Sequence, residues 1–425
     1  MKSIRNTARK VSFAARFFSF FRSNKWRLLF VSVPLLTLPF PAQRWIFANL
    51  GTPVRYVTSS YDAFGLMIKA NNGNILNFYR EGTTHAGDRG VMMLKVSTDN
   101  GTAWTYFSGK NYCQQGDHTG CLFSDSTYDS RNGAGGITPA GTIVLFWNTF
   151  TSQVGYYSRS TDNGASWSVP ARVRSTNPSN TYSVSYGPLV VVPKGRAKGS
   201  CSGGCIAGVF YASNNGHACL VFSYDDGVTW TDAKDIKYSN GMRIPTYEAA
   251  LLWAGGDQLI GFDRPGSNVP YLFLYSSNLG DSWTINPSNI AATPLVAGET
   301  LRINGQSMVS PWLIQPGLPD GSVTLLISER QMVTGGSSPV HGYLRAVTFK
   351  PQDAIRNAGN NPVVFGTAQM IFAQGSANSG VDFGYPSAVR ASGTTWLIEF
   401  YAQPSLSGVP NLYTMTAQYK TLPAD

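Results

Sequence analysis

The chain has 425 residues, 44 of them Gly, and only 13% of its residues are charged. It has no long stretch with helical periodicity, which argues against an all-α protein and favours an all-β chain with many tight turns. The net charge of +10 does not indicate nucleic-acid binding, because nine of the 33 Lys and Arg residues lie in residues 1–44, where no acidic residue occurs. The rest of the chain carries 24 basic and 23 acidic residues, which excludes a strongly basic surface for a polyanion.

Residues 1–44 are expected to be a targeting or anchoring segment. A basic stretch precedes the apolar run LLFVSVPLLTLPFP, which begins at Leu28. Its 14 residues suit the hydrophobic region of a signal peptide, are short for a membrane span and include three prolines. We therefore expect a secreted or membrane-anchored extracytoplasmic protein, with a virion-associated protein as the alternative. Any contact with a membrane would be made by this segment alone.

Four of the five cysteines form two pairs that are close in sequence, Cys113 with Cys121 and Cys201 with Cys205. We expect both pairs to form disulfides in an oxidising compartment. The alternative for the second pair is a zinc site with His217 and Cys219. No second ligand pair follows and the four histidines are scattered, so no metal site is expected.

Four related strings occur 63, 63 and 53 residues apart. They are STDNGTAW from Ser97, STDNGASW from Ser160, SYDDGVTW from Ser223 and SSNLGDSW from Ser276. Each follows a strand-like apolar run. Ser and Asp oxygens can accept backbone N–H bonds in a turn, Gly can adopt a positive φ, and Trp can pack the turn against a sheet. The strings therefore predict hairpin turns whose aspartates are structural rather than catalytic.

A second pattern, two apolar runs separated by a Gly-centred turn, occurs six times between residues 50 and 425. Each unit of roughly 60 residues can hold four short strands. Six such units in a ring form a six-bladed β-propeller of four-stranded antiparallel blades, which we expect to occupy residues 45–425.

The four strings resemble the Asp boxes of the sialidase (neuraminidase) superfamily, whose fold is a six-bladed β-propeller. The resemblance covers nearly all of the chain after residue 44. It implies a retaining glycoside hydrolase that needs no cofactor and removes a terminal sialic acid, or a related acidic sugar, from a glycan. Asp boxes also occur in propellers with other functions, so the resemblance bears more directly on fold than on activity.

Three residues resemble the catalytic groups of this superfamily by their place in the repeat. Tyr385, in FGYPSAV, corresponds to the nucleophile, and Glu248, at the start of an apolar strand, to the group that takes the tyrosine proton. Asp88, in the loop before the first Asp box, corresponds to the acid/base. The structural alternatives are a packing role for Tyr385 and an exposed loop position for Asp88. His85, in the same loop, could line the same pocket, but we expect it to be a solvated loop residue.

Three arginines are expected to bind substrate. Arg80 corresponds to a pocket arginine beside the acid/base, and Arg264 and Arg330 correspond to arginines that bind the sugar carboxylate. Guanidinium groups can hold a carboxylate through two parallel hydrogen bonds, and a neutral tyrosine nucleophile is not repelled by that anion. Arg345 competes with Arg330 for its role, and an ion pair with Glu248 is the structural alternative for Arg264.

The chain departs from the family pattern at its first arginine. That position falls near Asp62, and the glutamate that supports this arginine in the family is replaced by Ala402, with Glu399 out of phase. Phage endosialidases also work with a reduced arginine set. The alternatives are thus a phage-tail-like endosialidase or depolymerase, and a non-catalytic propeller that binds glycans. The expected partner is a sialoglycan or another acidic glycan; no nucleic acid is expected, and the oligomeric state stays open.

Overall fold

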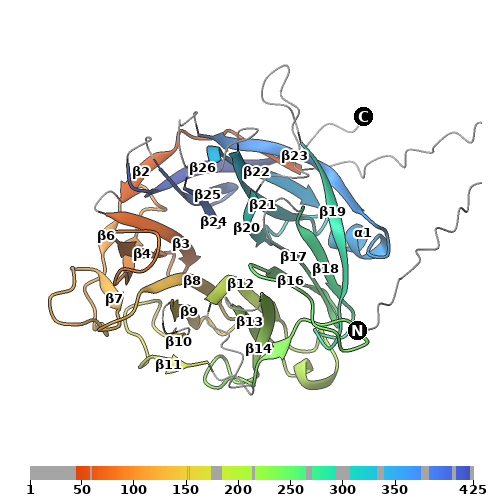
Figure 1. Cartoon of the computed structure of the whole chain (residues 1–425), viewed down its shortest axis with the longest axis horizontal. Helices are drawn as coiled ribbons and strands as arrows, with labels where there is room; N and C mark the ends of the chain where they lie inside the picture. Colours follow the sequence, from red (N-terminus) through yellow and green to blue (C-terminus); the bar gives the residue numbers. More distant parts are fainter. Residues whose placement is uncertain are drawn as a thin grey trace, which may run out of the picture. The chain divides into compact units, whose positions relative to one another are not determined.

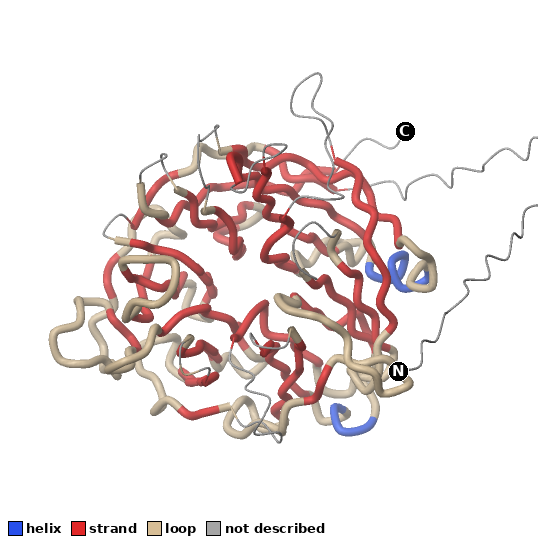
Figure 2. The backbone as a smooth tube through the Cα atoms, in the orientation of Figure 1, coloured by secondary structure: helices blue, strands red, loops and turns tan. Residues whose placement is uncertain are grey.

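The computed structural model describes residues 45–57, 60–150, 152, 154–173, 184–212, 216–264, 270–292, 307–332, 339–374, 382–403 and 408–421. Residues 1–44, with their expected targeting or anchoring role, lie outside this part. The regular elements of the described residues are all β-strands except one short α-helix, α1 (Pro351–Arg356), and one 3-10 turn, η1 (Gly199–Cys201) (Figure 2). Among them, no helix combines the length and apolar character needed to span a bilayer.

The first three groups of antiparallel strands follow each other along the chain (Figure 1). The first group contains β3 (Tyr61–Lys69), β4 (Ile75–Gly82), β5 (Val91–Ser97) and β6 (Thr105–Tyr106), and β7 (Cys121–Phe123) also pairs with β5. The second contains β8 (Ser130–Ile137), β9 (Ile143–Thr149), β10 (Val154–Ser160) and β11 (Ala171–Arg172). The third contains β12 (Val184–Val192), β13 (Cys205–Ala212), β14 (His217–Ser223) and β15 (Lys234–Asp235).

The last three groups repeat this order. The fourth contains β16 (Ala250–Gly255), β17 (Gln258–Asp263), β18 (Leu272–Ser276) and β19 (Thr284–Ala292). The fifth contains β20 (Ser307–Ile314), β21 (Val323–Met332), β22 (Pro339–Phe349) and β23 (Val363–Ala373). The sixth contains β24 (Phe383–Ser392), β25 (Thr395–Ala402) and β26 (Asn411–Thr421), which pairs with both β1 (Trp45–Ala48) and β2 (Val54–Val57).

The sequence led us to expect six separate four-stranded sheets, but these groups do not form them. Hydrogen bonds join them into two sheets of eight strands and two of five. One eight-stranded sheet arises because β8 and β12 pair at a single parallel position, Gly135 with Pro188. The other arises because the long strands β19 and β23 pair in parallel from Ser288 with Val363 onward.

The first strands of the groups are in contact from one group to the next. Strand β3 contacts β8, β8 contacts β12, β12 contacts β16, β16 contacts β20, β20 contacts β24, and β24 contacts β3. The two ends of the described chain also meet, since β1 pairs antiparallel with β26 in a register that opposes Trp45 to Thr421. Side chains at the starts of these first strands, although far apart in sequence, are thereby brought together.

The four repeated strings form the predicted hairpin turns, each beginning at the last residue of a third strand. In the second turn, Ser160 Oγ donates to Asp162 Oδ1 at 2.7 Å and accepts the Gly164 N–H at 2.8 Å. Asp162 Oδ1 also accepts the Ser166 N–H at 2.9 Å. Gly164 has φ 88° and lies so close to Leu76 that a Cβ there would be 2.8 Å from the leucine. Asp162 therefore accepts hydrogen bonds from donors within the turn and is not available for catalysis.

The tryptophan that ends the second turn joins two groups of strands. Trp167 is 5% exposed, and its ring lies edge-on to Phe78 of the first group at 5.4 Å. Both belong to one apolar cluster that also contains Phe123 and Trp147, whose rings are stacked at 4.1 Å. The turn thus packs its own group against the preceding one.

Replacing Trp167 by Ala should lower the free energy of unfolding by about 3–5 kcal/mol, because it removes a large buried ring and leaves a cavity between two groups. Urea denaturation followed by tryptophan fluorescence would measure the change. The matched control is Trp104→Ala in the first turn, where the ring is only partly buried and a smaller loss is expected. Equal losses at both positions would contradict the inter-group role of Trp167.

Candidate active site

Backbone bulges mark the starts of several first strands. Phe64, Asn132, Ser310 and Tyr385 have φ between 50° and 58°, and each lies where the pairing of its strand shifts register. Non-glycine residues rarely adopt this conformation, and such bulges re-aim a side chain and are common at functional sites. The bulges therefore indicate the centre of the site, and nothing in the sequence repeat predicted them.

Tyr385 and Glu248 form the central pair of the site. The Tyr385 hydroxyl donates a short hydrogen bond to Glu248 Oε1, joining β24 to the residue two before β16. Glu248 is 3% exposed, and its Oε2 accepts the Ser310 N–H at 3.0 Å and Arg264 Nη1 at 3.2 Å. The ion pair between Glu248 and Arg264 alone would fit a purely structural role for both residues. A structural ion pair does not account for the hydrogen bond from Tyr385 to Glu248.

The surroundings of this pair favour an ionised glutamate and a protonated tyrosine. Burial opposes ionisation of Glu248, but the Arg264 charge and the hydrogen bonds from Tyr385 and Arg264 outweigh it and lower the pKa of the carboxyl. Burial, followed by the negative charge of Glu248, raises the pKa of Tyr385. The glutamate can therefore accept the phenol proton when the tyrosine oxygen forms a new bond.

Arg330 lies beside this pair but is already bound to another acid. Its Nη2 donates to Asp382 Oδ1 at 2.9 Å and to the Tyr401 hydroxyl at 2.6 Å, and its Nε donates to the Phe383 carbonyl at 2.7 Å. The Tyr401 ring is 5.9 Å from that of Tyr385. Arg345, the alternative to Arg330 for the same role, is fully buried, and its Nε donates to Glu329 Oε2 at 2.7 Å. Of the two, Arg330 is therefore the arginine at the site.

Asp382 is a residue of the candidate site that the sequence did not reveal, and His85 lies beside it. His85 is exposed in its loop, as expected, yet its Nδ1 lies 2.9 Å from Asp382 Oδ2 and 2.6 Å from the Tyr61 hydroxyl. Its ring also lies edge-on to Phe64 at 5.4 Å. Asp382 stands three positions before Tyr385, and this proximity to the expected nucleophile was the one available signal.

Asp88 and Arg80 form the part of the site contributed by the first group. Arg80 is fully buried; its Nε donates to Asp129 at 2.6 Å and its Nη2 to Asp88 Oδ1. Asp88 Oδ2 also accepts hydrogen bonds from the Thr83 N–H and, at 2.9 Å, the Thr83 hydroxyl. Burial opposes ionisation of Asp88, but the bonds from Thr83 and the Arg80 charge together lower its pKa. Asp88 is therefore held as a carboxylate in the loop that also carries His85.

Phe64 lies two residues after Asp62, the position near which the family pattern has its first arginine. Asp62 is buried, and the Phe64 ring lies edge-on to Tyr385 at 4.7 Å. A cation from the second group covers this ring, with the Arg131 guanidinium 4.3 Å from its centroid. Arg131 Nη1 also donates to the His85 carbonyl at 3.0 Å. Arg131 was missed, although it lies at the start of a first strand, where such residues were expected.

Glu399 is buried near the position of the missing family glutamate, but it has a different environment. Its carboxylate accepts hydrogen bonds from the Tyr56 hydroxyl and the Asn77 amide, and Oε2 accepts the Ser387 hydroxyl at 2.9 Å. None of these partners is a cation. Burial raises the pKa of Glu399 to about 7, with the three hydrogen bonds acting in the opposite direction.

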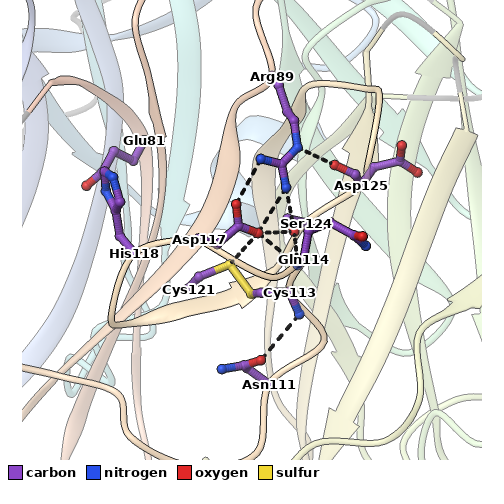
Figure 3. Close-up of a disulfide and its surroundings, with 10 residues drawn as sticks. All are labelled: Glu81, Arg89, Asn111, Cys113, Gln114, Asp117, His118, Cys121, Ser124 and Asp125. Atoms are coloured by element: carbon purple, nitrogen blue, oxygen red, sulfur yellow. Dashed lines mark hydrogen bonds and ion pairs between the residues drawn. A yellow bond between two sulfur atoms is a disulfide. The ribbon is translucent and has the colours of Figure 1, made fainter.

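A disulfide braces the loop next to Asp88 (Figure 3). Cys113 and Cys121 are joined, as predicted, and Arg89 Nη1 forms an ion pair at 2.9 Å with Asp117, which lies between the two cysteines. Arg89 Nε also donates to the Asp125 carbonyl at 2.8 Å. Cys113, Asp117 and Cys121 lie close enough to suggest a metal site, but the disulfide removes both thiolates.

The second predicted disulfide, Cys201–Cys205, is also present. The zinc alternative for this pair is therefore wrong, because a disulfide sulfur offers no thiolate. Cys219 is a buried free thiol, and burial raises its pKa.

Stability should fall as pH rises from about 4.5 to 7, in part because of Glu399. The folded chain holds this proton more tightly than the unfolded chain, whose glutamate has a pKa near 4.3, so the contribution is complete below that pKa and is lost as pH rises through the folded value of about 7. Glu399→Gln should reduce the dependence by about one proton. Urea titrations from pH 5 to 8 would measure it, with the exposed Asp281→Asn as control. An unchanged slope in the glutamine variant would contradict the assignment.

Comparison of the sequence with protein-family models and with curated proteins gives no match. Comparison of the structure gives several. A protein of unknown function from Dyadobacter fermentans DSM 18053 aligns over 87% of this chain and 98% of its own at TM-score 0.60 and 17% identity. The Hadza microbial sialidase Hz136 aligns over 88% and 68% at TM-score 0.54 and 16% identity.

The phage phi92 endosialidase aligns over 88% of this chain and 70% of its own, with TM-score 0.55 and 10% identity. At identities this low, the structural similarity establishes the fold alone, and the activity has to be argued from the residues of the site. Each of these alignments covers 87% or 88% of this chain. The chain therefore shares its fold with sialidases, among them a microbial sialidase and a phage endosialidase.

Proposed function

We propose that this chain is a sialidase-like glycoside hydrolase that removes a terminal sialic acid, or a related acidic sugar, from a glycan by a retaining mechanism. The observation that carries the proposal is the hydrogen bond from Tyr385 to a buried glutamate that is itself held by Arg264. A phenol bonded to a buried carboxylate can be a nucleophile without carrying a charge that the sugar carboxylate would repel. We further propose that the six strand groups of residues 45–425 are the blades of one six-bladed propeller.

In the first step, the Tyr385 oxygen attacks the anomeric carbon and Glu248 takes the phenol proton. The bond to the leaving oxygen breaks, and Asp88 supplies the proton that this oxygen needs. In the second step, water attacks the anomeric carbon, Asp88 takes a water proton, and Tyr385 leaves with the proton returned by Glu248. Since Asp88 is ionised in the free chain, its acid step requires prior protonation, whereas its base step does not.

Arg264 and Arg330 are the proposed ligands of the sugar carboxylate. Their side chains are 27% and 19% exposed, so both present guanidinium surface to a substrate. Arg80 is proposed to act through Asp88, because its own side chain is fully buried. No step in this scheme needs a metal or another cofactor.

An endo-acting enzyme on polysialic acid is the second candidate. The observation that favours it is the absence of an arginine near Asp62, where the aromatic Phe64 lies against Tyr385, because fewer arginines hold the carboxylate of a single terminal sugar less strongly. The fold similarity to the phage phi92 endosialidase is compatible with it.

We propose that residues 1–44 are a targeting or anchoring segment and that the protein works outside the cytoplasm. The two disulfides support this proposal, because such bonds form and persist in oxidising compartments.

Tyr385→Phe and Glu248→Gln should each reduce kcat by about 100-fold or more on a fluorogenic sialoside, because one removes the nucleophile and the other its proton acceptor. Asp88→Asn should reduce hydrolysis of sialyllactose more than that of the aryl sialoside, whose leaving group needs less protonation. Tyr224→Phe, at an exposed tyrosine of the third repeated turn, is the matched control and should keep full activity.

The same assays on polysialic acid separate the two candidates. Shortening of the polymer without release of sugar from sialyllactose would favour the endo-acting enzyme. Full activity of Tyr385→Phe on every substrate would overturn the tyrosine mechanism.

A further inference from the structure

Asp382 lies at the point where a substrate carboxylate would have to bind Arg330. Its Oδ1 is 2.9 Å from Arg330 Nη2, and its side chain is 20% exposed. Nε of Arg330 donates to the Phe383 carbonyl, and Nη2 donates to Asp382. Nη1 is thus the one guanidinium nitrogen that makes no hydrogen bond within the described part of the chain. A carboxylate that reaches Nη1 would therefore lie within a few ångströms of Asp382, and two carboxylates at that separation cannot both stay ionised without a large cost.

Every element that packs against Asp382 contributes a group that bears on its charge. Tyr61 of β3 and His85 of the following loop approach Oδ2. Arg330 of β21 and Tyr401 of β25 approach Oδ1. Arg330 is thus the cation in direct contact with it, and the two tyrosines can donate to Asp382 as a carboxylate or accept from it as an acid.

This inference rests on the proposed function. We propose that Asp382 is the carboxylate counter-ion of Arg330 in the free site and that an acidic sugar binds with uptake of one solvent proton by Asp382. The proton converts the carboxylate to the neutral acid and leaves the Arg330 charge to the incoming sugar. Protonation changes the net charge of the pair from zero to +1, and the bound sugar carboxylate restores it to zero, so the site binds an anionic sugar only when Asp382 is protonated. Asp382 is accordingly a specificity-determining residue rather than a catalytic one.

The titration of the neighbouring groups is consistent with a proton on Asp382. Burial raises the pKa of Asp382 to about 6, with the hydrogen bond from Tyr401 acting in the opposite direction. Partial desolvation of the half-exposed His85 ring, followed by the charges of Arg131, Arg330 and Arg80, lowers the pKa of His85 to about 3, so that histidine is already neutral over the same pH range.

The test is the binding of N-acetylneuraminic acid to the full chain, measured by titration calorimetry between pH 5.5 and 8. If one group of pKa about 6 must be protonated, the Kd should rise about 50-fold between pH 6 and pH 8. Titrations at pH 8 in two buffers of different ionisation enthalpy should show uptake of about one proton per bound sugar. Asp382→Asn should bind with a Kd that changes less than about twofold over this range, and Asp281→Asn, an exposed control, should behave like the wild type.

The outcomes distinguish this inference from the proposed function. Binding that is independent of pH, or that takes up no proton, would overturn the role of Asp382 and leave the proposed hydrolase intact. Absence of binding at pH 5.5 would overturn both. If Asp382→Asn does not fold, the proton count on the wild-type chain still decides. A kcat that falls more than tenfold in a folded Asp382→Asn variant, with unchanged pH dependence of Kd, would make Asp382 catalytic and overturn the inference.

Discussion

The hydrogen bond between Tyr385 and Glu248 joins residues 137 positions apart, and it depends on the closed succession of strand groups. Strand β24 must lie against both β20 and β3, and β16 must reach β20, for the two side chains to meet. The pairing of β1 with β26 holds the described ends of the chain together at the sixth group. Chemistry at the centre is therefore a property of the complete succession and not of any one group.

Charge at this centre is compensated before any substrate arrives. Arg264 has Glu248, Arg330 has Asp382, and Arg80 has Asp88 together with Asp129 as ion-pair partners. Pairing of this kind limits the cost of burying charged groups in a low-dielectric site. It also means that an anionic ligand must compete for each guanidinium, which makes the internal carboxylates as important for specificity as the arginines.

The repeated strings and the apolar runs predicted most of the local structure. The turns lie where Ser160 and its counterparts predicted them. A glutamate at the start of an apolar run, such as Glu248, requires a polar partner, and Arg264 is that partner in the structure. The merging of groups into eight-stranded sheets could not be predicted, since it depends on whether neighbouring strands come within hydrogen-bonding distance. Arg131 and Asp382 were missed for the same reason, because their roles come from contacts with Phe64 and Arg330 across groups.

The loss of the first arginine is the feature that most changes the expected grip on a substrate. Phe64, two residues after the position near Asp62, lies against Tyr385, and Glu399 binds neutral donors instead of a cation. Arg131 supplies positive charge from the second group, but its side chain is 6% exposed and lies over the phenylalanine ring. It can act on the site through its field and by holding the His85 carbonyl, and not as a direct ligand. In the proposed function, the direct hold on the sugar carboxylate therefore rests on Arg264 and Arg330, each of which already has an internal acid as its ion-pair partner.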